Sequence, residues 1–294
     1  MEGVVPHAPI RKLAGFGLTT PDAHQLADFY QDALGFRLLR VERRSGPEFE
    51  RLMGVEGGAA AISLGLGDQV VELMQFDQPG RSYPDDAAAS DLCFQHFAIV
   101  VADIQRAYQN LVAVRGWTAI STDGPQHLPA SSGGVTDFTF RDPDGHPLEL
   151  LAFPHGRMPA FWKTRCTGDL FLGIDHSAIS VADGAASIAF YEALGLRATA
   201  RSLNTGLAQE RLDAVGAARV EVTALQPEQA TPHLELLCYR SISRDATRIV
   251  ANDDVAATRL VFEGHQPFPG SNIAPQSLVD PDGHRLLIVS PPGD

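Results

Sequence analysis

The feature that most constrains the fold is a turn that occurs twice, each time followed by an aliphatic strand. Segments Asp142–His146 and Asp280–His284 both read Asp-Pro-Asp-Gly-His, with proline at the second and glycine at the fourth position of a type I turn. Two strands are therefore expected to meet at each turn. The copies differ in the strand that follows, because Leu287 stands where the first copy has Glu149. The hairpin is repeated, but its one charged strand residue is not.

The rest of the chain repeats one order of elements four times. Each unit is expected to begin with a strand, to continue through an aspartate into a helix, and to end in further strands. The expected first strands are 13–20, 94–101, 174–181 and 246–251, and the aspartates are Asp22, Asp103, Asp183 and Asp254. The fourth helix is expected to be brief and to end at Gly264. A recurring unit that cannot bury its apolar face alone must pair with another.

Length and repetition together predict two domains in the 294 residues. The predicted boundaries are an N-terminal domain at 10–155 with units 10–76 and 92–154, a linker at 156–171, and a C-terminal domain at 172–292 with units 172–240 and 243–290. The aromatic pair Phe161-Trp162 falls in the linker, where packing is the expected role rather than a substrate lid.

Charge and cysteine content exclude several classes of protein. The net charge is −13, with 23 basic and 36 acidic residues and no compensating basic block, so nucleic acid and anionic membranes are not expected partners. No run approaches the roughly 18 apolar residues of a membrane span, and no signal peptide is evident. The three cysteines lack CxxC spacing, which argues against a disulfide framework or a thiolate zinc site. A cytoplasmic monomer or homodimer that binds a small molecule is expected.

Aligning the four units singles out the residues that could carry chemistry. The first-strand positions seven residues before the aspartates are Gly15, His96, His176 and Thr247. The corresponding positions inside the last aliphatic strands are Glu72, Glu149, Glu235 and Leu287. Only the second and third units therefore have both a histidine and a glutamate.

These glutamates point to a metal ion. A carboxylate between two leucines that faces a concave interior would be costly to desolvate unless it binds a cation. Imidazole and carboxylate together suit Zn, Ni, Mn or Fe(II). Glu72 lacks partners and is expected to face solvent or substrate, whereas His233 and Tyr239 share the strand face of Glu235 and are expected to pack at the core or rim.

The layout resembles the vicinal oxygen chelate superfamily, which includes glyoxalase I, extradiol dioxygenases, methylmalonyl-CoA epimerase and bleomycin-resistance proteins. The resemblance covers all four units and rests on the first-strand histidines, the aspartate step into the helix, the repeated Phe-Tyr and Ala-Leu-Gly helix motifs (Phe29–Gly35 and Phe190–Gly195), and the turn hairpin. It implies an α+β fold of four βαβββ modules, paired into two cupped, mixed-sheet barrels that can each enclose a metal.

Two pairings of the units are open. Pairing in sequence order would place His96 and Glu149 in one cup and His176 and Glu235 in the other, so that both sites are incomplete. Pairing the second unit with the third, and the first with the fourth, would collect all four residues in one cup. The second pairing is favoured, because it explains why the losses fall in units one and four and because single-chain glyoxalases of this superfamily resemble it. His96, Glu149, His176 and Glu235 are then the predicted ligands of one divalent ion.

Three functions follow from this reading. The first is a glyoxalase-like lyase or isomerase, in which the ion holds vicinal oxygens of an enediolate and Glu149 or Glu235 moves the proton. The second is an extradiol-type, ring-cleaving dioxygenase using Fe(II) with His96, His176 and one glutamate. The third is a ligand-sequestering protein of the bleomycin-resistance kind, which needs no metal. The substrate is not indicated by the sequence.

Overall fold

The computed structural model describes residues 10–166, 168–240, 250–265 and 274–291. The first unit comprises β1 (Ile10–Thr19), α1 (Ala23–Leu34), β2 (Arg37–Arg44), α2 (Pro47–Met53), β3 (Ala59–Leu66) and β4 (Gln69–Phe76). The second comprises β5 (Gln95–Val101), α3 (Ile104–Val112), β6 (Thr118–Ala119), β7 (Gln126–His127), the 3-10 helix η1 (Ala130–Ser132), β8 (Thr136–Arg141) and β9 (Pro147–Ala152).

The linker and the second half of the chain follow the same plan. A short helix, α4 (Ala160–Lys163), lies between the halves. The third unit comprises β10 (Phe171–Ser180), α5 (Gly184–Ala193), β11 (Arg197–Thr205), α6 (Leu207–Asp213), β12 (Arg219–Gln226) and β13 (His233–Tyr239). The described part of the fourth unit comprises β14 (Arg259–Gly264), β15 (Gln276–Val279) and β16 (Arg285–Val289).

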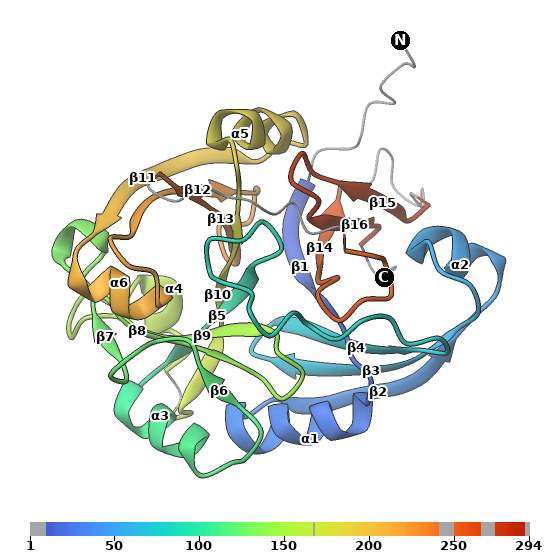
Figure 1. Cartoon of the computed structure of the whole chain (residues 1–294), viewed down its shortest axis with the longest axis horizontal. Coiled ribbons are helices and arrows are strands. Elements are labelled where there is room, and N and C mark those ends of the chain that lie inside the picture. Colours follow the sequence, from blue (N-terminus) through green and yellow to red (C-terminus); the bar gives the residue numbers. More distant parts are fainter. Residues whose placement is uncertain (1–9, 167, 241–249, 266–273, 292–294) are drawn as a thin grey trace.

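The strands form two mixed sheets, each built from two units (Figure 1). One sheet has seven strands in the order β15-β16-β14-β1-β4-β3-β2, which joins the first unit to the fourth. The other has nine strands, with the path β11-β12-β13-β10-β5-β9-β8-β6 and β7 beside β8, which joins the second unit to the third. The favoured pairing is therefore confirmed, and the pairing in sequence order is wrong.

The paired units form open sheets, so the α+β class and the pairing into mixed sheets are confirmed, but the sheets are not closed barrels. Each strand path ends at edge strands, β15 and β2 in one sheet and β11 and β6 in the other. Each sheet takes strands from both halves of the chain. The predicted division of the chain into domains at 10–155 and 172–292 stays a prediction.

Aspartates begin the three long helices of the first three units. Asp22, Asp103 and Asp183 have extended backbone and accept hydrogen bonds from amides in the first turn of α1, α3 and α5. Such side chains satisfy donors that the helix leaves unpaired. The helix starts used to align the first three units are therefore confirmed.

The fourth unit differs from the sequence prediction. Thr247 lies outside the described residues, and the prediction of a brief helix ending at Gly264 is wrong because residues 259–264 form β14. Leu260 and Phe262, which are two residues apart and so share one strand face, are both fully buried in the core. Asp254 caps no helix within the described chain; its carboxylate accepts from the amides of Arg81 and Ala251.

One apolar core joins the outer faces of both sheets to the long helices. It includes Phe16 of β1 and Phe97 of β5, whose stacked rings have centroids 4.9 Å apart. Helices α1 and α3 lie side by side beneath the sheets (Figure 1), where the Asn110 side chain donates to the carbonyl of Ala33 at 2.9 Å. Burial of this common layer stabilises both sheets as one body.

The repeated turn fastens each even-numbered unit to the unit before it. Tyr30 of α1 donates to the Oδ2 of Asp142 at 3.1 Å, and the His146 ring contacts the same oxygen at 2.8 Å and the Thr19 carbonyl at 3.0 Å. Both acceptors call for a protonated ring. Burial lowers the pKa of His146, but Asp142 outweighs it and raises the pKa.

The second turn makes the matching contacts to the helix and to the first strand. Tyr191 of α5 donates to Asp280 at 3.1 Å, and the His284 Nε2 contacts the Ser180 carbonyl at 2.9 Å. The repeated tyrosine and histidine are therefore structural residues.

Candidate metal centre

Four neighbouring strands in the middle of the nine-stranded sheet carry the four predicted ligands. His96 lies on β5, Glu149 on β9, His176 on β10 and Glu235 on β13. The register places Glu149 opposite Ala98, two residues after His96, and Glu235 opposite Ala178, two residues after His176. With a period of two, all four side chains point to one face of the sheet. We call this face the 2–3 cup.

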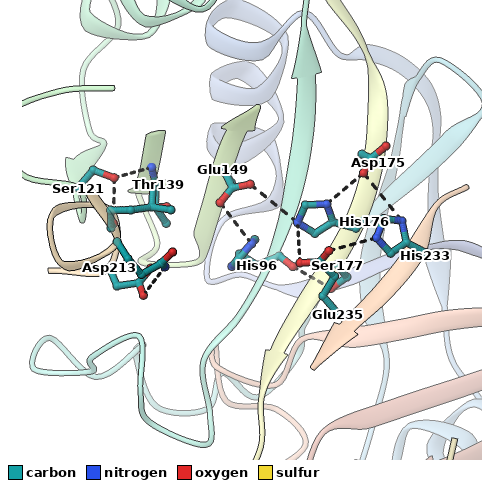
Figure 2. Close-up of polar contacts among 12 residues, drawn as sticks. His96, Ser121, Thr139, Glu149, Asp175, His176, Ser177, Asp213, His233 and Glu235 are labelled. Atoms are coloured by element: carbon teal, nitrogen blue, oxygen red, sulfur yellow. Dashed lines mark hydrogen bonds and ion pairs between the residues drawn. The ribbon is translucent and has the colours of Figure 1, made fainter. Parts of the chain in front are cut away.

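The four side chains converge at the floor of one cavity (Figure 2). His96 Nε2 lies 3.7 Å from Glu149 Oε2, and His176 Nε2 lies 3.8 Å from both Glu149 Oε1 and Glu235 Oε2. The cavity has a volume of about 390 Å³. Two imidazoles and two carboxylates from both halves of the chain thus share one pocket.

His96 has a surrounding that fits a metal ligand. Its side chain is 7% exposed, and neither ring nitrogen has a hydrogen-bond partner. Burial, followed by repulsion from His176, lowers the pKa of His96 to about 3, so the ring is neutral and offers a free lone pair. Buried polar groups are rarely left without a partner, and a bound cation would supply one.

His176 is oriented by the residue that precedes it. Asp175 Oδ2 lies 3.2 Å from His176 Nδ1, while Asp175 Oδ1 accepts a 2.7 Å hydrogen bond from Trp162. This arrangement turns His176 Nε2 toward Glu149 and Glu235. A carboxylate behind a histidine commonly fixes the tautomer of a metal-binding ring. The linker residue Trp162 is 1% exposed, so it packs as expected and also positions Asp175.

The charges in the site are strongly coupled. Burial acts to lower the pKa of His176, but Glu235, Asp175 and Glu149 raise it to about 10. Burial raises the pKa of Glu149 to about 7, against the attraction of His176. Burial also acts to raise the pKa of Glu235, but His176 and His233 lower it to about 2. The carboxylates therefore need a positive charge beside them, which either a protonated His176 or a bound cation can supply.

The donor set matches a divalent ion. The potential ligand atoms of His96, Glu149 and His176 all lie within 4.8 Å of one another, and Glu235 borders this group through His176. Nitrogen and oxygen donors in this combination suit Zn, Ni, Mn or Fe(II). A second group, made of Asp175, His176 and His233, is equally compact, but its Asp175 already accepts from Trp162. The first group fits an ion better.

The wall of the cavity contains three polar residues that the sequence reading missed, Asp137 of β8 and Gln209 and Asp213 of α6. Tyr239 of β13 packs in an apolar cluster, as expected, and its hydroxyl also donates to Asp213 at 2.9 Å inside the cavity. Asp137 is recognisable only from the register that pairs Thr139, two residues later, with Glu149. No sequence signal placed α6 over this face.

Among the residues that the structure describes, the seven-stranded sheet lacks a comparable site on its equivalent face, which we call the 1–4 cup. The register places Glu72 opposite Gly17 and Leu287 opposite Val261. Stepping back two residues assigns Gly15 and Arg259 to the positions of the two histidines. Arg259, and not Thr247, is therefore the fourth residue of the set.

Protein groups satisfy the charges of the 1–4 cup. Glu72 accepts a hydrogen bond from Arg44 Nη1 at 2.8 Å. It therefore forms an ion pair with a residue of the same sheet, whereas the sequence predicted that it faces solvent or substrate. Arg259 is 2% exposed and donates to Thr19 Oγ1 at 3.0 Å and to the carbonyl of Ala257 at 2.9 Å. An apolar cluster that includes Met53 of α2 packs on the same face.

Comparisons with known proteins agree with this architecture. Residues 12–150 match the model of the Glyoxalase/Bleomycin resistance protein/Dioxygenase superfamily. Glyoxalase I from Zea mays has 20% sequence identity over 95% of this chain and 92% of its own, with a TM-score of 0.58. A point variant of that protein has 18% sequence identity over 95% of this chain and 93% of its own, with a TM-score of 0.59. A provisionally assigned dioxygenase from Bacillus subtilis has 11% sequence identity over 97% of this chain and 87% of its own, with a TM-score of 0.58.

At these identities the likeness to solved structures concerns the fold. Comparison with curated protein sequences gives no significant match. Among the described residues, none of the helices is both long and apolar enough to cross a lipid bilayer.

Proposed function

We propose that the protein, whose residues 12–150 match the Glyoxalase/Bleomycin resistance protein/Dioxygenase superfamily, is a metal-dependent enzyme that moves a proton on a small substrate with neighbouring oxygens. The observation that carries the proposal is the convergence of His96, Glu149, His176 and Glu235 in one cavity. Two neutral imidazoles and two carboxylates would hold one divalent ion without excess charge. The reaction class is that of a glyoxalase-like lyase or isomerase.

The ion and the residues around it have separate tasks. A divalent cation in this site supplies a Lewis acid that stabilises negative charge on substrate oxygens. His96 and His176 hold it, and Asp175 keeps the His176 ring in the required orientation. The apolar walls of the cavity, which include Leu151 and Leu237, limit the access of water.

Glu149 and Glu235 are the two candidates for moving the proton. Each has an oxygen 3.8 Å from His176 Nε2. Both therefore reach the same region, Glu149 from β9 and Glu235 from β13, which lie on either side of the two histidine strands. A carboxylate that takes a proton from one carbon can return it to the next, which is general acid-base catalysis. Glu235 is also held at 3.3 Å by His233, whereas the contacts of Glu149 in the site are only with the two ligand histidines among the described residues.

The test is exchange of a substrate hydrogen with solvent. Small α-hydroxy aldehydes and ketones would be incubated in deuterium oxide with enzyme that is either loaded with Zn, Ni, Mn or Fe(II) or stripped by a chelator. We expect NMR to show deuterium entering the carbon next to the carbonyl only with loaded enzyme, and equally with or without oxygen. Equal exchange by stripped and loaded enzyme would contradict the proposal.

One observation favours a second candidate, an extradiol-type dioxygenase. The ligand group that fits an ion better consists of two histidines and one carboxylate, His96, His176 and Glu149, and does not include Glu235. That set is typical of Fe(II) enzymes that use oxygen. Oxygen consumption with a catechol, dependent on Fe(II) and unaccompanied by the exchange reaction, would establish this candidate in place of the first.

A further inference from the structure

The outer part of the 2–3 cup contains hydrogen-bond acceptors that have no partner. Asp137 is 3% exposed, and its Oδ1 makes no hydrogen bond. It lies on β8 opposite Leu151, which lines the cavity two residues beyond Glu149 on β9. The free oxygen therefore belongs to the same face as the candidate metal centre.

Gln209 supplies a second acceptor from the other side. It is 6% exposed, its Nε2 donates to Asp213 Oδ2 at 2.8 Å, and its Oε1 has no partner. Tyr239 donates to the same Asp213 oxygen at 2.9 Å. The Tyr239 hydroxyl and one N–H of Gln209 are thus engaged within the protein, and acceptor oxygens remain for a ligand.

Unpaired buried acceptors need an explanation, because leaving one without a partner costs roughly 1–3 kcal/mol. Asp137 and Gln209 come from different halves of the chain and line one cavity. A packing defect in a single loop would not explain two unpaired acceptors that meet in one cavity from separate elements. A ligand that brings hydrogen-bond donors would satisfy both.

The charge of the cavity limits what that ligand can be. Its acidic lining residues are Asp137, Glu149, Asp175, Asp213 and Glu235, and among the described residues Arg201, which is exposed, is the only lysine or arginine in the lining. A phosphate or carboxylate at this end of the cavity would be repelled. An ammonium group would be attracted by these carboxylates, although the divalent ion proposed nearby offsets part of that attraction. A hydroxyl group needs no opposite charge and can both donate and accept.

We propose that Asp137, Gln209 and Asp213 form a subsite for a hydroxyl group, and that the substrate is an uncharged, hydroxylated compound of the polyol or sugar type. This rests on the proposed function, since the same cavity must hold the reacting end of the substrate at His96, Glu149, His176 and Glu235. The subsite adds the identity of the other end.

The experiment compares three probes that differ only at one end: D-glyceraldehyde, its 3-deoxy analogue and its 3-phosphate, which are too short to close into a furanose ring. Calorimetry would measure their binding to the metal-loaded enzyme, to Gln209→Leu and Asp137→Asn, and to Gln105→Leu, an exposed position on α3 that serves as a matched control. One hydrogen bond corresponds to roughly 3–10-fold in affinity. We expect D-glyceraldehyde to bind that much more tightly than the 3-deoxy analogue to the wild type and the control.

We further expect this preference to disappear in Gln209→Leu or Asp137→Asn, and the 3-phosphate to bind no better than D-glyceraldehyde. The subsite would be overturned by equal binding of the deoxy analogue to the wild type, by tightest binding of the phosphate, by a preference that survives both substitutions, or by no binding of D-glyceraldehyde. The metal content of the same samples separates the two proposals. A loaded enzyme without the hydroxyl preference contradicts only the subsite, whereas failure to take up any of the four metals contradicts the proposed function.

Discussion

The 2–3 cup and the 1–4 cup are built from the same unit, yet they balance the charge of a strand glutamate in different ways. In the 2–3 cup, Glu149 and Glu235 face two histidines in a cavity of about 390 Å³. In the 1–4 cup, Glu72 is paired with Arg44, and Arg259 takes the position of a histidine. The 1–4 cup uses a side-chain cation where the 2–3 cup is proposed to bind a metal ion, because a carboxylate withdrawn from water requires a positive partner in either case.

The helix between the second and third strands of a unit also differs between the two cups. In the first unit this helix is α2, whose Met53 joins an apolar cluster with Met74, Phe76 and Leu287 on the 1–4 cup. In the third unit it is α6, whose Gln209 and Asp213 line the open cavity. One cup is packed as a core and the other is kept as a pocket. The comparison teaches that the unit provides a scaffold, and that strand and helix side chains decide whether it holds a site.

The largest expected effect is the loss of turnover in the 2–3 cup. Glu149→Gln and Glu235→Gln keep the shape of the side chain but remove the group that can take a proton, which typically costs on the order of 10²- to 10⁴-fold in rate. The residue that moves the proton should show the larger loss in the deuterium-exchange assay. Glu72→Gln, the matched variant in the other cup, should exchange at the wild-type rate, and equal losses in both cups would erase the distinction between them.

A smaller effect, on stability instead of activity, is expected at Arg259. Replacing it with methionine removes charged hydrogen bonds to Thr19 and Ala257, each of which is typically worth roughly 1.5–3 kcal/mol. Because methionine also removes the cost of burying the guanidinium charge, chemical denaturation should show a free energy of unfolding that is lower by only about 2–3 kcal/mol. Metal content should stay at the wild-type value. If Arg259→Met lowered metal content without lowering stability, the 1–4 cup would be the functional one.

Gly15 sharpens the comparison further, because it stands where the other cup has a histidine. A Cβ at this position would lie 2.3 Å from the carbonyl oxygen of Val70, so a backbone strand must move to admit any side chain. Gly15→Ala is expected to lower the free energy of unfolding by about 1–3 kcal/mol. Gly216→Ala, where a Cβ meets nothing within 4 Å, is the control. Equal stabilities of the two variants would show that the 1–4 cup can still accommodate a side chain at the position where the 2–3 cup has a histidine.

The smallest effect is expected for Glu72 itself. Its partner Arg44 has a side chain that is 39% exposed, and ion pairs open to solvent contribute roughly 0–1 kcal/mol. Glu72→Gln should therefore change the midpoint of thermal unfolding only slightly. A loss of several kcal/mol would mean that Glu72 carries more of the 1–4 cup than the exposed ion pair suggests.

Much of this comparison could be predicted from the sequence. His96 and His176 share an offset from residues that do cap helices, Asp103 and Asp183, and the glutamates share a place in the last strand. The offset failed in the fourth unit, because Asp254 binds the backbone of Arg81 and Ala251 instead of starting a helix. Arg259 was therefore missed.

The outer wall of the 2–3 cup was less accessible to sequence reasoning. Gln209 and Asp213 lie on a short helix whose position over the sheet depends on contacts distant in the chain, such as the hydrogen bond from Ser121 to the carbonyl of Leu212. Asp137 becomes recognisable only when β8 is placed in register with β9. Local patterns identify residues that repeat, whereas residues that occur once need the tertiary structure.

The central claim is that both halves of the chain contribute ligands to a single ion in the 2–3 cup. Elemental analysis of purified wild type, His96→Ala, His176→Ala and Arg259→Met, each after equilibration with the same divalent metal, tests it most directly. The account predicts about one ion per chain in the wild type and in Arg259→Met, and strong depletion in both histidine variants, because each loses a ligand of the same ion. Full metal content in either histidine variant would contradict it.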